Sequence, residues 1–533
     1  MTVTTDHLTE QPTQSVSSPS VPGEMTHAEI LRAMTGLLAA LFTAMLSATI
    51  VATALPTIIA DLKGTQSQYT WIITASLLAT TVSTPIWGKL ADLFSKKVLV
   101  QSATVVFVAG SVAAGLAHDV PFLIACRVVQ GVGMGGLTAL AAAIMGAIVS
   151  PRERGRYSGY MGAVMAVSTV SGPLLGGFVV DSWGWRWTFY VCVPLAIIAI
   201  VVIQTQLHLH TVKRRPRIYY VGAVLISLTA CLPLLWVTFS GTDFPWLSWP
   251  SAAFVVGTLV VGWVTLGVER RAPEPLVPLK VLSNRTAVLA IVASVAVGIA
   301  MFGGTTFLGQ YFQVAQGYSP TKAGLMTIPL MVAAMLSSTI AGQIISRTGR
   351  WKAFLVGGGA LLVIGLAGLS LLRHDTPAWA SGISMAVMGL GMGALMQNLV
   401  LAVQNTVDVR DIGAASAAVS FFRSLGGAIG VSALGAILAN LVQSQVHDGV
   451  VALGPAVTAA AGSGDSGNLD LKSMPPVIAT IVRTAYGDAT GQIFLVAAIV
   501  AVAALVAVIF IREVPLRTTV ALERPQNVVA EQS

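Results

Sequence analysis

The stretch GKLADLFSKK at residues 88–97 separates two apolar segments, and a related stretch, GQIISRTGRWK, occupies residues 342–352. In each stretch a glycine is followed eight positions later by a basic residue. The next charged loops also correspond, with RERG at 152–155 and RDIG at 410–413. The apolar segment before each loop is stepped with glycines, which are Gly131, Gly133 and Gly135 in the first copy and Gly389, Gly391 and Gly393 in the second. Three features in the same order predict an internal repeat of two halves in parallel register.

Outside these loops the chain is a ladder of apolar segments. Hydrophobic residues make up 55% of the 533 residues and charged residues 10%, whereas a soluble domain carries about a quarter charged residues. A spanning helix needs about 20 apolar residues. The segments that meet this requirement are approximately 33–56, 69–87, 98–117, 121–147, 157–180, 187–206, 218–240, 249–268, 287–312, 321–345, 352–372, 378–403, 413–440 and 490–512. We therefore expect an all-α polytopic membrane protein with fourteen transmembrane helices.

The repeat divides the chain into parts. We expect a disordered cytoplasmic tail over 1–30, a six-helix bundle over 31–206, and a linker with two inserted transmembrane helices over 207–286. A second six-helix bundle follows over 287–512, with a long outer loop at 441–489, and a cytoplasmic tail covers 513–533. With the N-terminus in the cytoplasm, 22 of the 30 Lys and Arg residues lie in cytoplasmic segments and six lie outside. This positive-inside bias predicts that both termini are cytoplasmic.

Two arginines, Arg127 and Arg423, are the charged residues that fall inside the expected spans, and no carboxylate joins them there. A charge at the bilayer centre costs about 2.5–3.5 kcal/mol on insertion scales, so such residues are usually functional. Gln130 lies one helical turn beyond Arg127 and offers both a donor and an acceptor. The alternatives are a snorkelling arginine at Arg127 and a purely structural partner for Arg423 at a helix C-terminus.

Other chemistry has little support in the sequence. The three cysteines all fall within spans, and the seven histidines form no ligand-spaced cluster, so we expect no metal and no cofactor. No phosphate-binding Walker pattern is present, which argues against an ATP-driven pump. The net charge of +8 follows from the cytoplasmic loops, and no basic stretch is interleaved with aromatic residues, so no nucleic-acid partner is expected.

Several motifs resemble those of the fourteen-span drug:proton antiporters of the major facilitator superfamily, the group of EmrB- and QacA-type multidrug exporters. Residues 88–97 fit the family's loop motif except at Leu93 and Ser95, and 46–56 fits a first-span signature that usually carries Asp where this chain has Ser47. Residues 127–133, RVVQGVG, resemble the fourth-span motif assigned to proton coupling. The fifth span contains the expected antiporter motif, made of Gly172, Pro173, Gly176 and Gly177.

The resemblance implies a major facilitator fold of two six-helix bundles plus two inserted helices. It also implies that the protein is not an enzyme but an exporter of lipophilic drugs or antibiotics, driven by the proton-motive force through alternating access. Arg127 and Gln130 would take part in proton coupling, Asp92 would act as a gate, and Arg423 is a further candidate in the thirteenth span. The nearest candidates for the proton carrier are Asp61 and Asp181, although each is equally well explained as a loop acid.

The remaining expectations concern the substrate and its route. The expected cavity residues are Ser47, Thr49, Trp71, Phe302, Thr306, Gln310, Tyr311, Gln397 and Asn398, because walls with few fixed polar groups suit lipophilic ligands. The expected partners are a lipophilic small molecule, protons and the lipid bilayer, and we expect a monomer in a bacterial cytoplasmic membrane. A dedicated exporter of one metabolite, antibiotic or lipid and an uncoupled uniporter remain as alternatives.

Overall fold

The computed structural model describes residues 27–148, 154–206, 220–240, 244–245, 247–271, 283–407, 412–452 and 475–515. Within these residues the secondary structure is helical, with a single isolated bridge between Ser240 and Phe244. In this described part of the chain, eleven helices are long and apolar enough to cross a membrane. The all-α fold expected from the apolar ladder is therefore confirmed.

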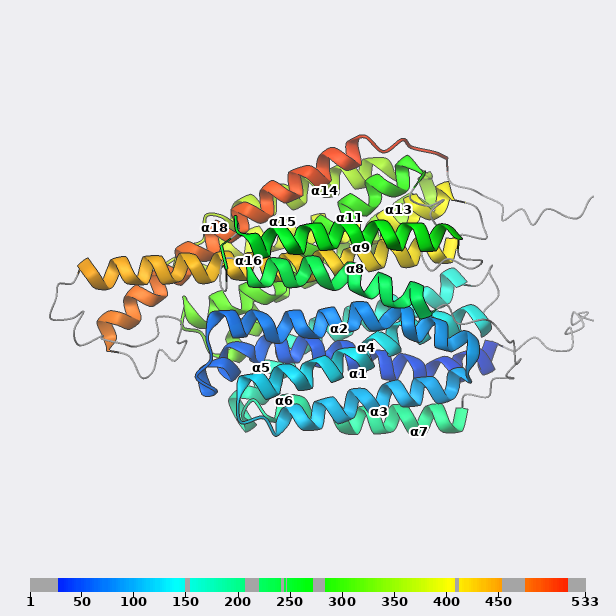
Figure 1. Cartoon of the computed structure of the whole chain (residues 1–533), viewed down its shortest axis with the longest axis horizontal. Coiled ribbons are helices and arrows are strands. Elements are labelled where there is room, and N and C mark those ends of the chain that lie inside the picture. The colour runs from blue at the N-terminus through cyan, green and yellow to red at the C-terminus, as the bar shows by residue number, and fades with distance from the viewer. Residues whose placement is uncertain are drawn as a thin grey trace, which may run out of the picture.

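The helices form two halves that lie side by side (Figure 1). The first half, called the N-half, contains α1 (His27–Asp61), α2 (Gln66–Leu93), α3 (Lys96–Gly115), α4 (Val120–Ile148), α5 (Arg154–Trp183), α6 (Trp187–Tyr190) and α7 (Cys192–Gln206). The second, called the C-half, contains α11 (Arg285–Val314), α12 (Pro320–Met326), α13 (Ile328–Thr348), α14 (Lys352–Leu369), α15 (Ala378–Thr406), α16 (Ile412–Ala452) and α18 (Pro476–Ile509). The two inserted helices are α8 (Tyr220–Phe239) and α9 (Trp249–Arg271). Each expected span falls on one helix or on a broken pair, α6–α7 or α12–α13.

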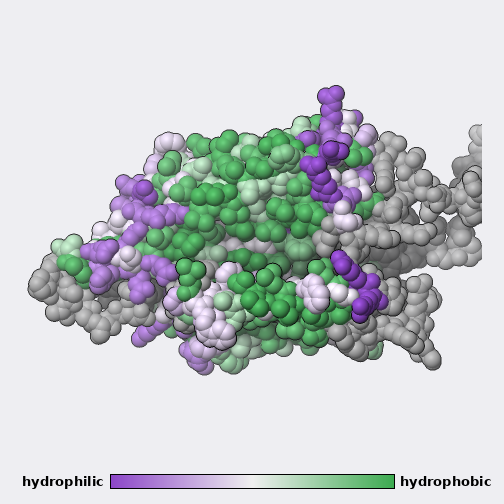
Figure 2. Space-filling model, turned by 45° about the horizontal axis from the view of Figure 1, so that its top comes forward, coloured by the Kyte–Doolittle hydropathy of each residue, from purple (hydrophilic) through white to green (hydrophobic). Residues whose placement is uncertain are grey.

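The bundle has two ends, which we name after residues that lie there. The Asp61 end is where α1 finishes, and the Lys96 end is where α3 begins. An apolar belt separates the more polar surfaces near the two ends (Figure 2). Local signals set the helix boundaries: α2 begins with a capping box between Thr65 and Gln68, and α13 stops at Gly349, whose φ is 70°.

The loop expected over 441–489 is helical at both of its ends. The helix α16 continues to Ala452 and α18 begins at Pro476, while 453–474 lies outside the described residues. These extensions pack on each other, because Val446 and Val482 are buried and a Cβ at Gly449 would lie 2.6 Å from Ile481. The apolar spacing from Pro476 onward belongs to a helix that packs against its neighbour, not to an irregular loop.

The glycine repeat has the same packing role in both halves. A Cβ at Gly131 of α4 would lie 2.5 Å from the carbonyl oxygen of Ser76 on α2, and one at Gly389 of α15 would lie 2.2 Å from that of Leu330 on α13. In the same way Gly133 faces α3 and Gly391 faces α14. Because only a residue without a side chain permits such approaches, the repeated glycines fix the same helix crossings twice.

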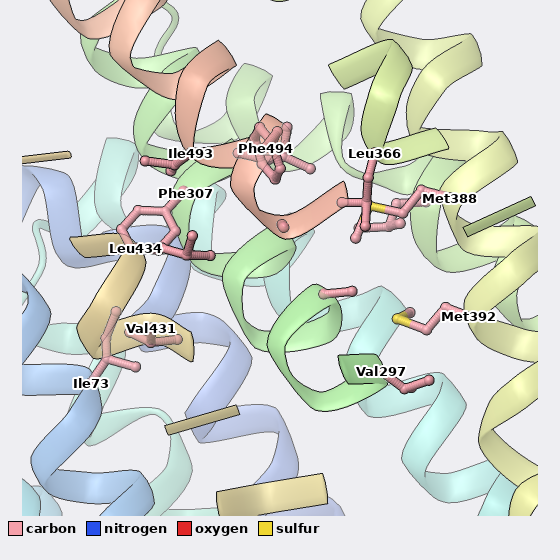
Figure 3. Packing of buried hydrophobic residues seen from close by; sticks show 14 of the residues in the cluster. Ile73, Val297, Phe307, Leu366, Met388, Met392, Val431, Leu434, Ile493 and Phe494 are labelled. Carbon is pink, nitrogen blue, oxygen red and sulfur yellow. The ribbon is translucent and has the colours of Figure 1, made fainter. Parts of the chain in front are cut away.

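A continuous apolar core joins α2 to the C-half. Ile73 of α2 lies beside Val431 and Leu434 of α16, and the cluster continues through Phe307 and Phe494 to the methionines of α15 (Figure 3). A second cluster fills the N-half around α1, α3, α4 and α7. The core therefore crosses between the halves on the α2 side.

Candidate functional site

The Arg127 side chain lies inside the N-half, 5% exposed, and is held by neutral groups. Its Nη1 donates to Oε1 of Gln130 at 2.5 Å, and its Nε donates to the carbonyl oxygen of Ile72 at 3.4 Å. The fully buried Gln130 in turn donates from Nε2 to Ser47 at 3.2 Å and to Ser111 at 2.8 Å. Four helices, α1 to α4, therefore meet at one polar network around a guanidinium.

Among the described residues of the C-half, no polar network corresponds to this one. Gly110 of α3 lies against the backbone of Gln130, where a Cβ would come within 2.7 Å of its nitrogen, and Gly365 of α14 lies against Met388 in the same way, at 2.3 Å. Met388 therefore takes the place of Gln130 in the repeat, and Met385, three residues earlier, takes that of Arg127. Both methionines are fully buried. The two halves share their packing but not their chemistry, because the buried charge and its polar partners occur in the N-half.

Arg423 of α16 lies at the crossing with α11, where a Cβ on Gly298 would meet its carbonyl oxygen at 2.0 Å. Its Nη1 donates to the carbonyl oxygen of Met396 on α15 at 3.3 Å. Gln397, the next residue, is exposed. The structure thus gives Arg423 a backbone carbonyl as partner and places it in a different half from Arg127.

The fifth-span motif closes a seam between the halves. Gly172 and Gly176 face α1, where a Cβ at Gly176 would lie 2.9 Å from the carbonyl oxygen of Ile50. Gly177 faces the C-half instead, and a Cβ there would lie 2.4 Å from Cα of Thr321 on α12. The contact is mutual, because a Cβ at Gly324 would lie 2.3 Å from the carbonyl oxygen of Pro173. The motif therefore packs α5 onto both α1 and α12 at the Asp61 end.

A cluster of uncharged polar side chains joins the halves at the same end. Gln66 of α2 and Gln310 of α11 exchange two amide hydrogen bonds, at 3.2 and 2.5 Å. The Tyr486 hydroxyl of α18 donates to Oε1 of Gln66 at 3.0 Å, and the Tyr69 hydroxyl donates to the carbonyl oxygen of Thr306 at 3.1 Å. All five residues are buried. We call Gln66, Gln310 and Tyr486 the amide latch.

Two further contacts extend the closed region. On the α1–α11 contact, Gln313 donates from Nε2 to the carbonyl oxygen of Thr53 at 2.7 Å. On the α2–α16 contact, the Thr74 and Ser432 hydroxyls lie 2.9 Å apart. These hydrogen bonds add to the contacts that join the two halves.

The carboxylates at the Asp61 end have different partners. Asp61 accepts from Nε1 of Trp185 at 2.8 Å and lies 3.6 Å from Nη1 of Arg186, all within the N-half. Asp181 accepts from the backbone N–H of Thr321 at 3.1 Å and from the Thr321 hydroxyl, so its contacts join the halves. The backbone of Asp92 belongs to α2, but its side chain lies outside the described part of the structure, so its gating role stays a prediction.

The expected cavity residues take part in several separate contacts. Ser47 belongs to the Arg127 network, and Thr49 packs against α5. The ring centroid of Trp71 lies 5.5 Å from that of Phe239 on the inserted helix α8. Gln310 belongs to the amide latch and Thr306 supplies its carbonyl oxygen beside that latch. The others lie elsewhere in the C-half: Phe302 packs against Gly427, Tyr311 donates to the carbonyl oxygen of Arg373 at 2.6 Å, and Asn398 donates to that of Ala394 at 2.7 Å.

Sequence reasoning missed some polar residues of the interior. Gln66, Tyr69 and Tyr486 lie close to the ends of expected spans, where polar residues are unremarkable in a sequence. A second omission is Glu269 of α9, which is 4% exposed although it falls just after an expected span. A single sequence does not show that Gln66 is a buried, paired amide, because its partner Gln310 lies about 240 residues away in the chain.

The chain matches known proteins along most of its length. The family model described as Major Facilitator Superfamily matches residues 37–431. The MFS-type transporter Rv1877 of Mycobacterium tuberculosis is 35% identical over 476 residues, which are 88% of this chain and 67% of that protein. The multidrug transporter protein MdtP of Bacillus subtilis is 31% identical over 406 residues, 76% of this chain and 74% of that protein. The efflux pump dotC of Dothistroma septosporum is 31% identical, with 92% and 85% covered.

Solved structures support the same fold. A bacterial homologue of the human lysosomal transporter Spinster has a TM-score of 0.66 at 14% identity, with 91% of this chain and 98% of that chain covered. A peptide transporter of the POT family has a TM-score of 0.62 at 13% identity, with 93% and 99% covered. The repeated glycine crossings, the seam and these matches lead to one conclusion: the chain is a multi-pass membrane protein that belongs to the Major Facilitator Superfamily of transporters.

Proposed function

We propose that this transporter exports lipophilic small molecules and takes its energy from the proton gradient. The observation that carries the proposal is the seam at the Asp61 end, where α5 meets α12 and the amide latch ties α2 to α11 and α18. A contact concentrated at one end of two packed bundles lets them rock about the interior, so that access alternates between the two ends. The names of the relatives, a multidrug transporter and an efflux pump, support drug-like substrates.

The arrangement of charge supports substrates without a fixed positive charge. The guanidinium of Arg127 stays protonated at physiological pH, and it donates to the side-chain amide oxygen of Gln130 and to the carbonyl oxygen of Ile72, which are both uncharged. A permanent cation in the same bundle would face an uncompensated like charge. Neutral, zwitterionic or weakly acidic lipophiles are therefore the proposed substrate class.

Asp181 is the better of the two candidate proton carriers. Its hydrogen bonds to Thr321 join the halves, whereas the partners of Asp61 stay within one half. When the seam opens, Asp181 loses both of these donors, so its contacts differ between the closed and the open state.

The carboxylate-free network around Arg127 favours a second candidate, an uncoupled uniporter. The two functions differ in their energy requirement, because a membrane potential of 100 mV supplies about 2.3 kcal/mol per charge moved. The test is efflux of the neutral dye Nile red from proteoliposomes with an imposed pH gradient. Protonophore-sensitive accumulation against a dye gradient supports antiport, whereas counterflow without accumulation in any gradient supports uniport and contradicts the main proposal.

The direction of transport depends on topology. We propose a monomer in a bacterial cytoplasmic membrane with both termini and the Lys96 end in the cytoplasm. Reporters fused after Arg217 and after Ser248 flank the inserted helix α8, and we expect the first inside and the second outside. Both reporters on one side would contradict the proposed orientation.

A further inference from the structure

The two halves meet along two related seams. One is formed by α5 with α12 and α13, and the other by α2 with α16. Gly177 of α5 lies against α12, and Gly435 of α16, at the corresponding place in the repeat, lies against α2, where a Cβ would come within 2.3 Å of the Thr70 hydroxyl. Each seam reaches the surface of the bundle, where lipid would surround a spanning protein. By the repeat alone the two seams should be equally accessible from the bilayer.

The inserted helices remove this equivalence. The helix α8 packs against both α2 and α16 and so lies across their seam (Figure 1). Its inward face is buried and apolar, with residues at helical spacing: Ile226, Ala230, Leu234 and Val237. At the Asp61 end Phe239 closes against Trp71 of α2, with ring centroids 5.5 Å apart.

The helix α9 holds α8 in this position. The Thr229 and Thr265 hydroxyls lie 2.9 Å apart, and Nε1 of Trp236 donates to the Ser251 hydroxyl at 2.5 Å. The rest of α9 exposes large apolar side chains such as Trp263. In lipid these two polar pairs join the helices more firmly than apolar contact alone would.

Corresponding positions on the two seams differ in their exposure. On α13, Met335 is 41% exposed, whereas its counterpart on α2, Thr81, is 3% exposed. On α5, Phe178 is 54% exposed, whereas its counterpart on α16, Ala436, is 8% exposed. Among the described residues, the elements packed along the α5–α13 junction are those of the two halves themselves, with no third helix across it comparable to α8.

The uncovered seam also has a suitable surface for lipophilic molecules. Residues 160–180 of α5 and 328–345 of α13 contain no Asp, Glu, Lys or Arg. The exposed side chains of these two helices include Met165, Val167 and Leu336. Unbranched methionines adapt their shape to different ligands, and apolar solutes concentrate in the bilayer from which these side chains are accessible.

We propose that the two inserted helices make access from the bilayer one-sided: they close the α2–α16 seam, and lipophilic substrate reaches the space between the halves through the α5–α13 seam. This inference rests on the proposed function, because it concerns the route of a lipophilic substrate. It assigns α8 and α9 a role as a stationary cover.

The test attaches a bulky hydrophobic group at one seam at a time in a cysteine-free background. Leu336→Cys on α13 places a thiol at the uncovered seam, and Leu228→Cys places one on the exposed side of α8. Both are modified with pyrene maleimide in proteoliposomes, and the initial rate of Nile red efflux is measured. We expect the adduct at 336 to remove most of the efflux and the adduct at 228 to leave the rate of the unmodified protein.

Controls separate plugging of the route from other losses. A methylthio adduct at 336 should leave efflux intact, because it is no larger than the leucine it replaces. The Ile226→Ala/Leu234→Ala variant removes apolar side chains by which α8 packs on the α2–α16 seam. In this variant the pyrene adduct at 336 should no longer block efflux completely, because substrate can also enter through the α2–α16 seam. Unchanged efflux with the pyrene adduct at 336, or equal loss at 336 and 228, would overturn the inference. Absence of efflux from the unmodified protein would instead contradict the proposed function.

Discussion

Replacing Gln310 with leucine should release the amide latch without adding bulk. Gln310 exchanges two hydrogen bonds with Gln66 across the halves, and both residues are buried. Leucine has a similar size and cannot hydrogen-bond, so the Nε2 donor of Gln66 loses its acceptor while its Oε1 keeps the Tyr486 hydroxyl. The variant therefore raises the free energy of the state that is closed at the Asp61 end.

The size of the effect follows from the lost hydrogen bonds. Leaving a buried polar group unsatisfied costs about 1–3 kcal/mol. When the halves separate, water satisfies the Gln66 amide, so this cost applies to the closed state alone. A free-energy difference of this size changes the ratio of the two states by about 5- to 150-fold.

The assay measures how often the Asp61 end opens. Ser432 lies in the α2–α16 seam, 1% exposed, and Ser432→Cys in a cysteine-free background places a thiol there. A membrane-impermeant maleimide added at the Asp61 end reacts with this thiol in the open state, so its rate should rise by the same factor in Gln310→Leu. The matched control is Asn398→Leu, because Asn398 is a buried amide whose partner is in its own helix.

A second variant tests the reasoning from the other direction. Replacing both partners of a hydrogen bond by apolar groups is nearly neutral, so Gln66→Leu/Gln310→Leu combined with Tyr486→Phe should react close to the original rate. If the introduced thiol reacts no faster in Gln310→Leu than in Asn398→Leu, the Gln66–Gln310 pair does not hold the halves together, and the proposed role of the amide latch is wrong.

Three further predictions concern transport itself. Gly177→Leu should abolish dye efflux while the protein stays in the membrane, because Cα of Thr321 leaves no room for a side chain. The control is Gly257→Leu on α9, which has open space around it and should transport normally. Equal efflux from the two variants would contradict the close packing of α5 on α12. Arg127→Ala should stop proton-driven efflux, and Arg127→Lys should retain part of it, because lysine keeps the charge but lacks the planar guanidinium with its several donors. Normal dye accumulation by the alanine variant would show that Arg127 has a structural role instead. Asp181→Asn should keep counterflow but lose dye-driven proton release, measured with a pH-sensitive dye inside vesicles; unchanged release would exclude this carboxylate as the carrier.

The difference between the expected and observed positions of the polar residues has a physical origin. An apolar stretch predicts a spanning helix because the bilayer requires it, so the spans and the repeat were predicted from the sequence. The direction in which a polar side chain points depends on the neighbouring helix. The sequence alone could therefore not predict that Trp71 lies beside Phe239 or that the Tyr311 hydroxyl donates to the carbonyl oxygen of Arg373.

The sequence by itself determined the all-helical fold, the internal repeat and the small-residue crossings, because each depends on residues that are close together in the chain or on the demands of the lipid. The tertiary structure decided what crosses between the halves. In the tertiary structure Gln66 is hydrogen-bonded to Gln310, Asp181 accepts from Thr321, and α8 packs against one of the two seams that correspond in the repeat. These contacts join residues separated by long stretches of chain, and the sequence of one partner carries no information about the position of the other.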